Sequence, residues 1–188
     1  MAENEEKVGK LLKEYPRLRE LVLDQLGVDL IENQSLREWI IGTLVNQVKD
    51  EFFYQPASMT GRYHPFSELD SGGLVRHTQN CIVMAQTLKP LYSFNSEEWD
   101  HIIGALILHD IAKPSKLHPI EAHKFFAPGN PRILKHIRAI EELIGSHMGK
   151  WDQEGQLPRP KSTSQQFVHL CDYLASRRHI IIDTREEL

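Results

Sequence analysis

The chain has 188 residues, of which 40% are hydrophobic and 26% are charged, and its formal net charge is -4. This length suits one domain with a sizeable core, and the composition argues against both a disordered chain and a membrane protein. A negative net charge gives no general attraction to a polyanion, so we expect no binding to duplex DNA. No stretch approaches about 20 consecutive apolar residues, and the acidic N-terminal segment is followed by no apolar run. We therefore expect a cytoplasmic protein without a membrane partner.

Two runs of apolar residues at helical spacing lie before residue 50, one within residues 11–22 and the other within 36–48. Asn33 and Ser35 are both suited to cap the second helix. We interpret residues 1–50 as an N-terminal helical extension packed on the core. Its apolar stripes fit three roles: a part of the core, a lid, or the contact face of a homodimer.

Residues 51–188 form the main domain, in which apolar residues keep helical spacing. The spacing and the Pro, Gly and Ser residues between the runs predict further helices at 74–88, 96–113, 121–126, 132–144 and 167–174. No alternating strand pattern persists beyond a few residues, so the predicted fold class is all-α, a single helical bundle with the N-terminal pair attached. Cys81 and Cys171 lie in apolar helical patterns, which favours two reduced core thiols without a catalytic role over a disulfide.

Asp110 is the residue with the least structural reason to be where it is. It follows Ile107 by three residues on the apolar stripe of the helix predicted to end at Pro114, so its carboxylate should point inward. A buried carboxylate costs several kcal/mol unless a partner charge neutralises it. No lysine or arginine precedes Asp110 on this face, which makes a metal ion its natural partner.

His77, the pair His109 and Asp110, and Asp172 lie at or beside the apolar faces of three predicted helices. A single histidine on such a face is more often a hydrogen-bonded core residue than a ligand. Two imidazoles and two carboxylates together favour a metal site. Mixed histidine and carboxylate ligands suit Mn²⁺, Fe²⁺, Co²⁺, Ni²⁺ or Zn²⁺ better than Mg²⁺.

Residues 53–178 resemble the HD-domain metal-dependent phosphohydrolases, whose signature is H…HD…D. The segment from Gly72 to Thr78 is similar to the GGL-x-x-HT element of the HD domain in bacterial 3′→5′ exoribonucleases, and His109 to Lys113 is similar to HDIGK, with Ala112 in place of glycine. The segment around Asp172 resembles the closing element of those enzymes. The resemblance implies an HD helical bundle in which these histidines and aspartates hold one or two divalent metal ions.

Two further histidines enter through a resemblance to HD-GYP phosphodiesterases. His118 stands in a segment similar to HPxxG, and His147 stands where that family has a histidine pair, with Met148 in place of the second histidine. The resemblance implies a second metal ion held by His118, His147 and a bridging Asp110, and His123 is the alternative to His118. The tripeptide after Gly155 is Gln-Leu-Pro rather than GYP, which argues against cyclic-di-GMP hydrolysis.

The resemblance also implies roles around the metal ions. Asp110 would orient or bridge the attacking water, and Lys113, near the end of the same predicted helix, would hold a phosphate oxygen; the alternative for Lys113 is a solvated helix-end lysine. His64 would contact the substrate phosphate or protonate the leaving oxygen, or would be a plain surface histidine. The remaining histidines are interpreted as surface or supporting residues, with His169 placed to orient Asp172.

These features predict an enzyme that cleaves a phosphoester of a nucleotide or short oligonucleotide with a metal-activated water. A small nucleotide is favoured because no OB domain precedes the bundle to feed single strands into the site. The alternative is a non-catalytic HD module that binds a nucleotide or a metal for regulation. Metal-dependent oxidation at a di-iron centre is a third interpretation.

Overall fold

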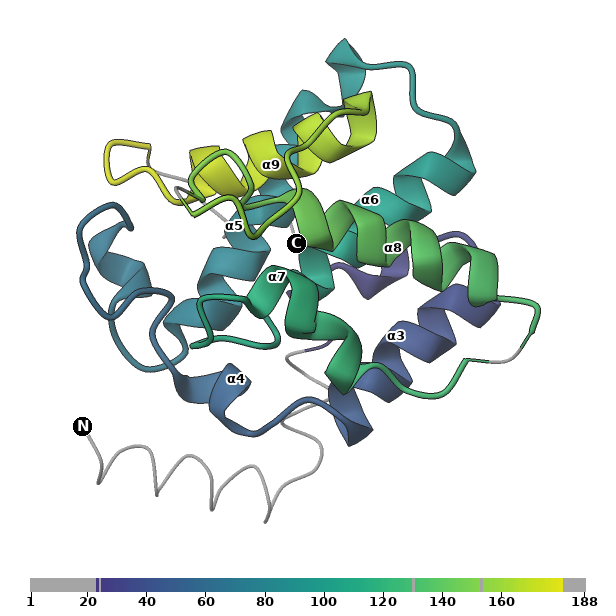
Figure 1. The fold of residues 1–188 in the computed structure, drawn as a ribbon, viewed down its shortest axis with the longest axis horizontal. Coiled ribbons are helices and arrows are strands. Elements are labelled where there is room, and N and C mark those ends of the chain that lie inside the picture. Colours follow the sequence, from purple (N-terminus) through teal and green to yellow (C-terminus); the bar gives the residue numbers. More distant parts are fainter. Residues whose placement is uncertain (1–22, 24, 130, 153, 181–188) are drawn as a thin grey trace.

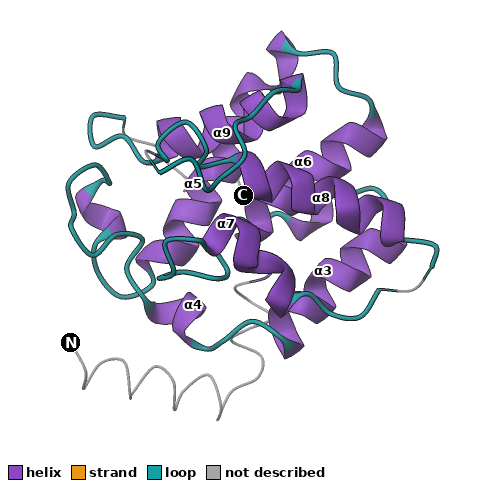
Figure 2. Cartoon of the chain, in the orientation of Figure 1, coloured by secondary structure: helices purple, strands orange, loops and turns teal. Residues whose placement is uncertain are grey.

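The structure is a computed structural model that describes residue 23 and residues 25–129, 131–152 and 154–180. This part of the chain is helical and contains no strand (Figure 2). Its α-helices are α3 (Gln34–Asn46), α4 (Glu51–Tyr54), α5 (Gly73–Leu88), α6 (Ser96–Leu108), α7 (His118–Glu121), α8 (Leu134–Ser146) and α9 (Thr163–Ala175). Short 3₁₀ helices lie between them: η1 (Val28–Leu30), η2 (Phe66–Glu68), η3 (Lys89–Leu91) and η4 (Ala122–Phe125). The predicted all-α class is confirmed.

The bundle around the core is formed by α5, α6, α8 and α9. α6 contacts α5, α8 and α9, and α5 and α9 pack along each other (Figure 1). Ile102, Ile103 and Leu106 of α6 are fully buried, and each such side chain contributes roughly 1.5 to 3 kcal/mol through apolar burial. None of the described helices is long and apolar enough to cross a membrane.

The second helix of the predicted N-terminal pair is α3, and it belongs to the core. Leu36, Ile40 and Leu44 are fully buried in the same hydrophobic cluster as α5, α6 and α9. Of the two predicted caps, Asn33 and Ser35, the cap is Asn33, whose side chain accepts a hydrogen bond from the backbone N–H of Leu36. The first predicted helix, within residues 11–22, lies outside the described residues.

The helix α6 begins at Ser96 as predicted, but its end differs from the prediction. Asn95 caps the helix and forms a capping box with Glu98. It ends at Leu108 rather than at Pro114. After Leu108 the backbone N–H groups of residues 111 and 113 bond carbonyls three residues earlier, as in turns. Asp110 and Lys113 therefore lie on a tight turn rather than on the helix.

The start of α5 depends on glycine. A Cβ atom on Gly73 would lie 2.1 Å from the carbonyl oxygen of Glu68, at the point where that oxygen accepts a hydrogen bond from Ala57. We expect Gly73→Ala to lower the free energy of unfolding by about 3 kcal/mol, because two backbone segments must separate. Gly42→Ala in α3 meets nothing within 4 Å and should stabilise the helix by up to about 1 kcal/mol. Urea unfolding of both variants tests this, and a Gly73 variant as stable as the wild type would contradict it.

Candidate metal centre

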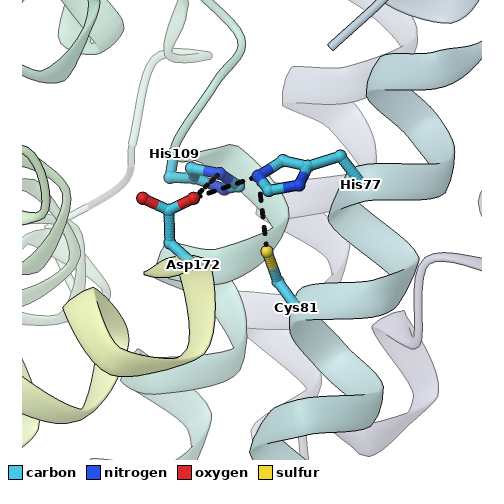
Figure 3. A group of neighbouring side chains, drawn as sticks. All are labelled: His77, Cys81, His109 and Asp172. Atoms are coloured by element: carbon cyan, nitrogen blue, oxygen red, sulfur yellow. Dashed lines mark hydrogen bonds and ion pairs between the residues drawn. The ribbon is translucent and has the colours of Figure 1, made fainter. Parts of the chain in front are cut away.

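The four residues of the H…HD…D pattern meet at one buried point. His77 comes from α5, His109 and Asp110 from the turn after α6, and Asp172 from α9, and all are at most 6% exposed. Nε2 of His77 lies 3.0 Å from Oδ1 of Asp172, and Nε2 of His109 lies 3.2 Å from Oδ2 of Asp110. Figure 3 shows His77, His109 and Asp172 turned toward one another, together with Cys81. The four side chains that the sequence pattern brought together are therefore neighbours in one buried cluster.

A second group meets the other oxygen of Asp110. Nε2 of His118 lies 3.0 Å from Oδ1 of Asp110 and 3.3 Å from Nε2 of His147, and Nε2 of His147 lies 3.9 Å from the same Oδ1. His118 and His147 are both buried. His123 is exposed and bonds the carbonyl of Ile120, so the structure does not bring it to this group. Asp110 thus stands between two sets of side chains, each facing a different carboxylate oxygen.

Three of the histidine rings are oriented by backbone carbonyls. Nδ1 of His109 donates to Leu106 at 2.7 Å, and the corresponding atoms of His118 and His147 donate to Ser115 at 2.9 Å and to Ile144 at 2.7 Å. A carbonyl only accepts, so Nδ1 carries the hydrogen in each ring. A neutral ring of this tautomer presents a lone pair on Nε2, which is the ligating atom in many histidine metal sites.

Glu68 was not identified from the sequence, yet it supports the site directly. Its side chain is fully buried, and Oε2 accepts a hydrogen bond from Nδ1 of His64 at 2.7 Å and lies 3.2 Å from Nδ1 of His77. Oε1 accepts from the side-chain amide of Asn80. A carboxylate behind a histidine favours the ring orientation that directs Nε2 forward. Glu68 ends η2, a single turn too short for a periodic pattern, and the only signal was its i,i+4 spacing from His64.

The side chains present fit a metal ion. Nε2 of His109 is buried and makes no hydrogen bond within the described residues, although buried polar atoms normally have a partner. Nitrogen and oxygen atoms of His109, Asp110 and His147 lie within 4.8 Å of one another, as do ligand atoms of His77, Cys81, His109 and Asp172. The ammonium of Lys113, 2.6 Å from Oδ2 of Asp110, is a partner charge that the sequence argument did not anticipate. Even with this ammonium beside Asp110, Nε2 of His109 still has no hydrogen-bond partner among the described residues.

The HD domain family matches residues 74–177, which is more than half of the chain and includes His77, His109, Asp110 and Asp172. The chain belongs to the HD-domain family. HD domains are metal-dependent phosphohydrolases in general, and the His and Asp cluster of this HD domain could hold a divalent metal ion. No curated protein and no solved structure matches the chain.

The surroundings of Asp110 and Glu68 hold the pKa of each carboxyl below its usual value. Burial raises the pKa of Asp110, but His109 and Lys113 outweigh burial and hold that pKa well below its usual value. For Glu68, burial also acts to raise the pKa, yet hydrogen bonds from His64 and His77 lower it to about 2. Burial lowers the pKa of His64, and the hydrogen bond to Glu68 opposes this only in part. His64 is therefore a neutral imidazole near pH 7.

We expect the metal-stripped protein to be most stable near pH 6.5. Burial, with His109 and His118 nearby, lowers the pKa of His147 from 6.5 to about 3. Between these two pH values the unfolded chain binds a proton at His147 that the folded protein does not bind. The free energy of unfolding therefore rises with pH between about 3 and 6.5. Burial lowers the pKa of His77, but Cys81, Asp172 and Glu68 raise it well above 6.5. The folded state therefore keeps this proton longer, and stability falls as the pH rises above 6.5 through the raised pKa.

Thermal unfolding in chelator from about pH 4 to about pH 9 tests this maximum. His147→Asn should flatten the rise on the acid side and leave the fall on the alkaline side. A melting temperature that keeps rising above pH 7 would contradict the argument for His77.

A cavity of about 610 Å³ opens beside the cluster. His64, Lys113 and His118 line one part of it, and Met148 and Trp151 line another. The volume is that of a small-ligand site. Lys113 is 20% exposed and also donates to the carbonyl of Ala57, so it lies between the buried cluster and the cavity.

The other histidines were predicted to be surface or supporting residues, and His169 alone differs from its predicted role. His169 was expected to orient Asp172, but its Nδ1 donates to the carbonyl of His147 at 2.7 Å and its ring packs on Trp151. His101 and His136 pair with each other between α6 and α8 at 2.8 Å, and His179 is exposed. His169 thus supports the position of His147 rather than that of Asp172.

Proposed function

We propose that this protein is a metal-dependent phosphohydrolase that cleaves a phosphoester of a nucleotide or short oligonucleotide. The observation that carries the proposal is the position of Asp110, with Oδ2 near His77 and His109 and Oδ1 near His118 and His147. One ion would be held by His77, His109, Asp110 and Asp172, and a second by Asp110, His118 and His147. The mixture of imidazole and carboxylate favours Mn²⁺, Fe²⁺, Co²⁺, Ni²⁺ or Zn²⁺.

Different side chains of this site have different roles in the proposed hydrolysis. When bound, divalent metal ions lower the pKa of a water molecule and polarise a phosphoryl oxygen. Asp110 accepts a hydrogen bond from the attacking water and orients it, because its carboxylate is ionised and faces both histidine groups. The side chains of the cluster are buried, and their low-dielectric surroundings strengthen each of these polar contacts.

Lys113 and His64 face the substrate side in this proposal. Both line the cavity, and the Lys113 ammonium is close enough to Asp110 to bond a non-bridging oxygen of a phosphate seated there. Neutral His64 donates its Nδ1 hydrogen to Glu68, so its other nitrogen is an acceptor. That state suits binding of a substrate hydroxyl better than protonation of a leaving oxygen.

Trp151 favours a nucleotide over a phosphoester without a base. It lines the cavity and is 37% exposed. Its ring stacks on Tyr173 with centroids 5.8 Å apart and packs at a tilt against His169 with centroids 4.5 Å apart, and these contacts hold the ring in place. A base stacked on an aromatic ring contributes about 1 to 3 kcal/mol. We expect Trp151→Ala to raise KM for a nucleotide roughly 5- to 150-fold and to leave KM for glycerol phosphate unchanged. Equal effects on both substrates would contradict base stacking.

The function is tested with metal-stripped protein resupplied separately with Mn²⁺, Co²⁺, Ni²⁺, Zn²⁺ and Mg²⁺. Each sample is given nucleoside monophosphates and triphosphates, cyclic nucleotides and short oligonucleotides, and the products are separated by chromatography. Metal-dependent release of product supports the proposal and names the substrate class. Saturable nucleotide binding without product, by protein shown to hold metal, would overturn it in favour of the regulatory HD module.

A further inference from the structure

Cys81 lies among the side chains of the first proposed metal site. It follows His77 by four residues on α5, so both side chains lie on one helix face, and Cys81 is fully buried. Its Sγ atom is 3.6 Å from Nε2 of His77. In Figure 3 the sulfur points toward the ring nitrogen of His77 that also faces Asp172. One ligand atom from each of these four residues lies within 4.8 Å of the other three.

The distances match those between the ligands of one ion. For a tetrahedral site with metal–sulfur and metal–nitrogen bonds of about 2.3 and 2.05 Å, the sulfur and nitrogen atoms are about 3.6 Å apart, and nitrogen and oxygen ligands are about 3.4 Å apart. The structure has 3.6 Å between Cys81 and His77, and 3.0 and 3.9 Å from Asp172 to His77 and His109. Small side-chain shifts would equalise the last two distances.

A packing role explains Cys81 less completely. Buried cysteine often serves as a small apolar residue, but the Sγ atom of Cys81 lies beside Nε2 of His77. A ligand atom of His109, whose Nε2 has no hydrogen-bond partner, is also within 4.8 Å of this sulfur. Once Nε2 of His77 binds a metal ion, the thiol loses that contact, which is its sole hydrogen-bonding contact among the described residues. The sulfur would then face the ion at ligand distance.

We propose that the Cys81 thiolate is a ligand of the first metal ion, together with His77, His109 and Asp172. This inference rests on the proposed metal site and adds to it a soft ligand. On binding, the thiol proton is released to solvent and a metal–sulfur bond forms, with no change in oxidation state. Thiolate ligation favours Zn²⁺, Co²⁺ or Fe²⁺ over Mn²⁺ and Mg²⁺. Cys81 would join Asp110 at the first ion, and Asp110 would still orient the water and face the second ion through its other oxygen.

The experiment adds Co²⁺ to metal-stripped protein and records its absorption spectrum. A thiolate bound to Co²⁺ gives an intense charge-transfer band in the near ultraviolet, which imidazole and carboxylate ligands do not. We expect this band in the wild type and in Cys171→Ala, and its loss in Cys81→Ala. Cys171 is a matched control because it is also a free, buried thiol but is not among the residues whose ligand atoms meet in the cluster.

Metal affinities provide a second readout that does not depend on activity. Because even residues behind the ligands change affinity 10- to 100-fold, Cys81→Ala should weaken Zn²⁺ binding by about 100-fold or more. Binding of Mn²⁺ should change less than about tenfold, since manganese gains little from sulfur. Circular dichroism checks that both variants fold.

The outcomes separate this inference from the proposed function. Wild-type protein that binds Co²⁺ without a thiolate band, or Cys81→Ala that keeps the band, overturns ligation by Cys81 and leaves the histidine and aspartate site standing. Folded wild-type protein that binds none of the metals overturns both. Equal losses of Zn²⁺ and Mn²⁺ affinity in Cys81→Ala would show a packing defect and would also overturn the inference.

Discussion

Asp110→Asn should lower hydrolysis by at least about 1,000-fold and weaken the binding of both metal ions. The substitution keeps the shape of the side chain and removes its charge. In the wild type, His109 and Lys113 lie beside one carboxylate oxygen and His118 and His147 beside the other. No other single residue of the described site contacts both histidine groups through a carboxylate.

The same substitution should also lower the stability of the fold. Without the Asp110 carboxylate, the Lys113 ammonium, which is largely buried, loses its counter-charge, and breaking a buried pair costs about 3 to 5 kcal/mol. Double substitution of Asp110→Asn with Lys113→Met should therefore recover much of that stability without restoring hydrolysis. Recovery of activity in the double variant would show that Asp110 serves only to neutralise Lys113.

Asp100→Asn is the matched control, because Asp100 is also a buried carboxylate that belongs to the α6 segment. Its two oxygens accept hydrogen bonds from the backbone N–H groups of Glu32 and Asn33 at 2.8 and 2.9 Å. This variant should lose stability, since two charged hydrogen bonds are weakened, but keep its metal content and its kcat. Metal content is measured by elemental analysis after gel filtration. Metal loss in Asp100→Asn as large as in Asp110→Asn would contradict a specific role for Asp110.

The inward position of the metal-binding candidates could be predicted because it follows from periodicity. His77 and Asp172 are on helices whose apolar spacing continues through them, and both are buried. Asp110 is buried as predicted, but the helix ends at Leu108 and a turn places the carboxylate. Helical spacing thus predicted correctly that the Asp110 carboxylate points inward, but it predicted a helix where the structure has a turn.

The partners of these residues could not be predicted from periodicity. Lys113 is three residues after Asp110, and only the turn brings its ammonium to 2.6 Å from the carboxylate. His118 and His147 were proposed through resemblance alone, since their convergence depends on how α7 and α8 pack. Cys81 had a readable signal in its i,i+4 spacing from His77, but a core thiol and a ligand have the same pattern in sequence.

Glu68→Ala should lower the free energy of unfolding by about 3 to 5 kcal/mol and weaken metal binding about 10- to 100-fold. The fully buried carboxylate accepts hydrogen bonds from Nδ1 of His64 and from the side-chain amide of Asn80, and it lies 3.2 Å from Nδ1 of His77. Its removal leaves the half-buried His64 and the buried Asn80 without their hydrogen-bond acceptor and takes the charge away from beside buried His77. His77 then loses the contact that directs its Nε2 toward Asp172.

The two consequences of losing Glu68 can be separated by a second variant. Glu68→Gln fills the same volume, but its side-chain NH₂ group must face one of the donors that Glu68 accepts from, so ring orientation is disturbed while packing is kept. We expect most of the loss of metal affinity and less of the loss of stability in this variant. Thermal unfolding with chelator and metal titration give the two quantities independently.

Glu38→Ala is the control, because Glu38 is exposed on α3 and bonds only the side chain of Gln34 among the described residues. It should change stability by less than about 0.5 kcal/mol and leave metal affinity unchanged. If Glu68→Gln binds metal as tightly as the wild type, His77 is held by packing and the carboxylate acts on stability alone. If affinity falls in Glu68→Gln while folding persists, a residue outside the H…HD…D pattern determines how well that pattern binds metal.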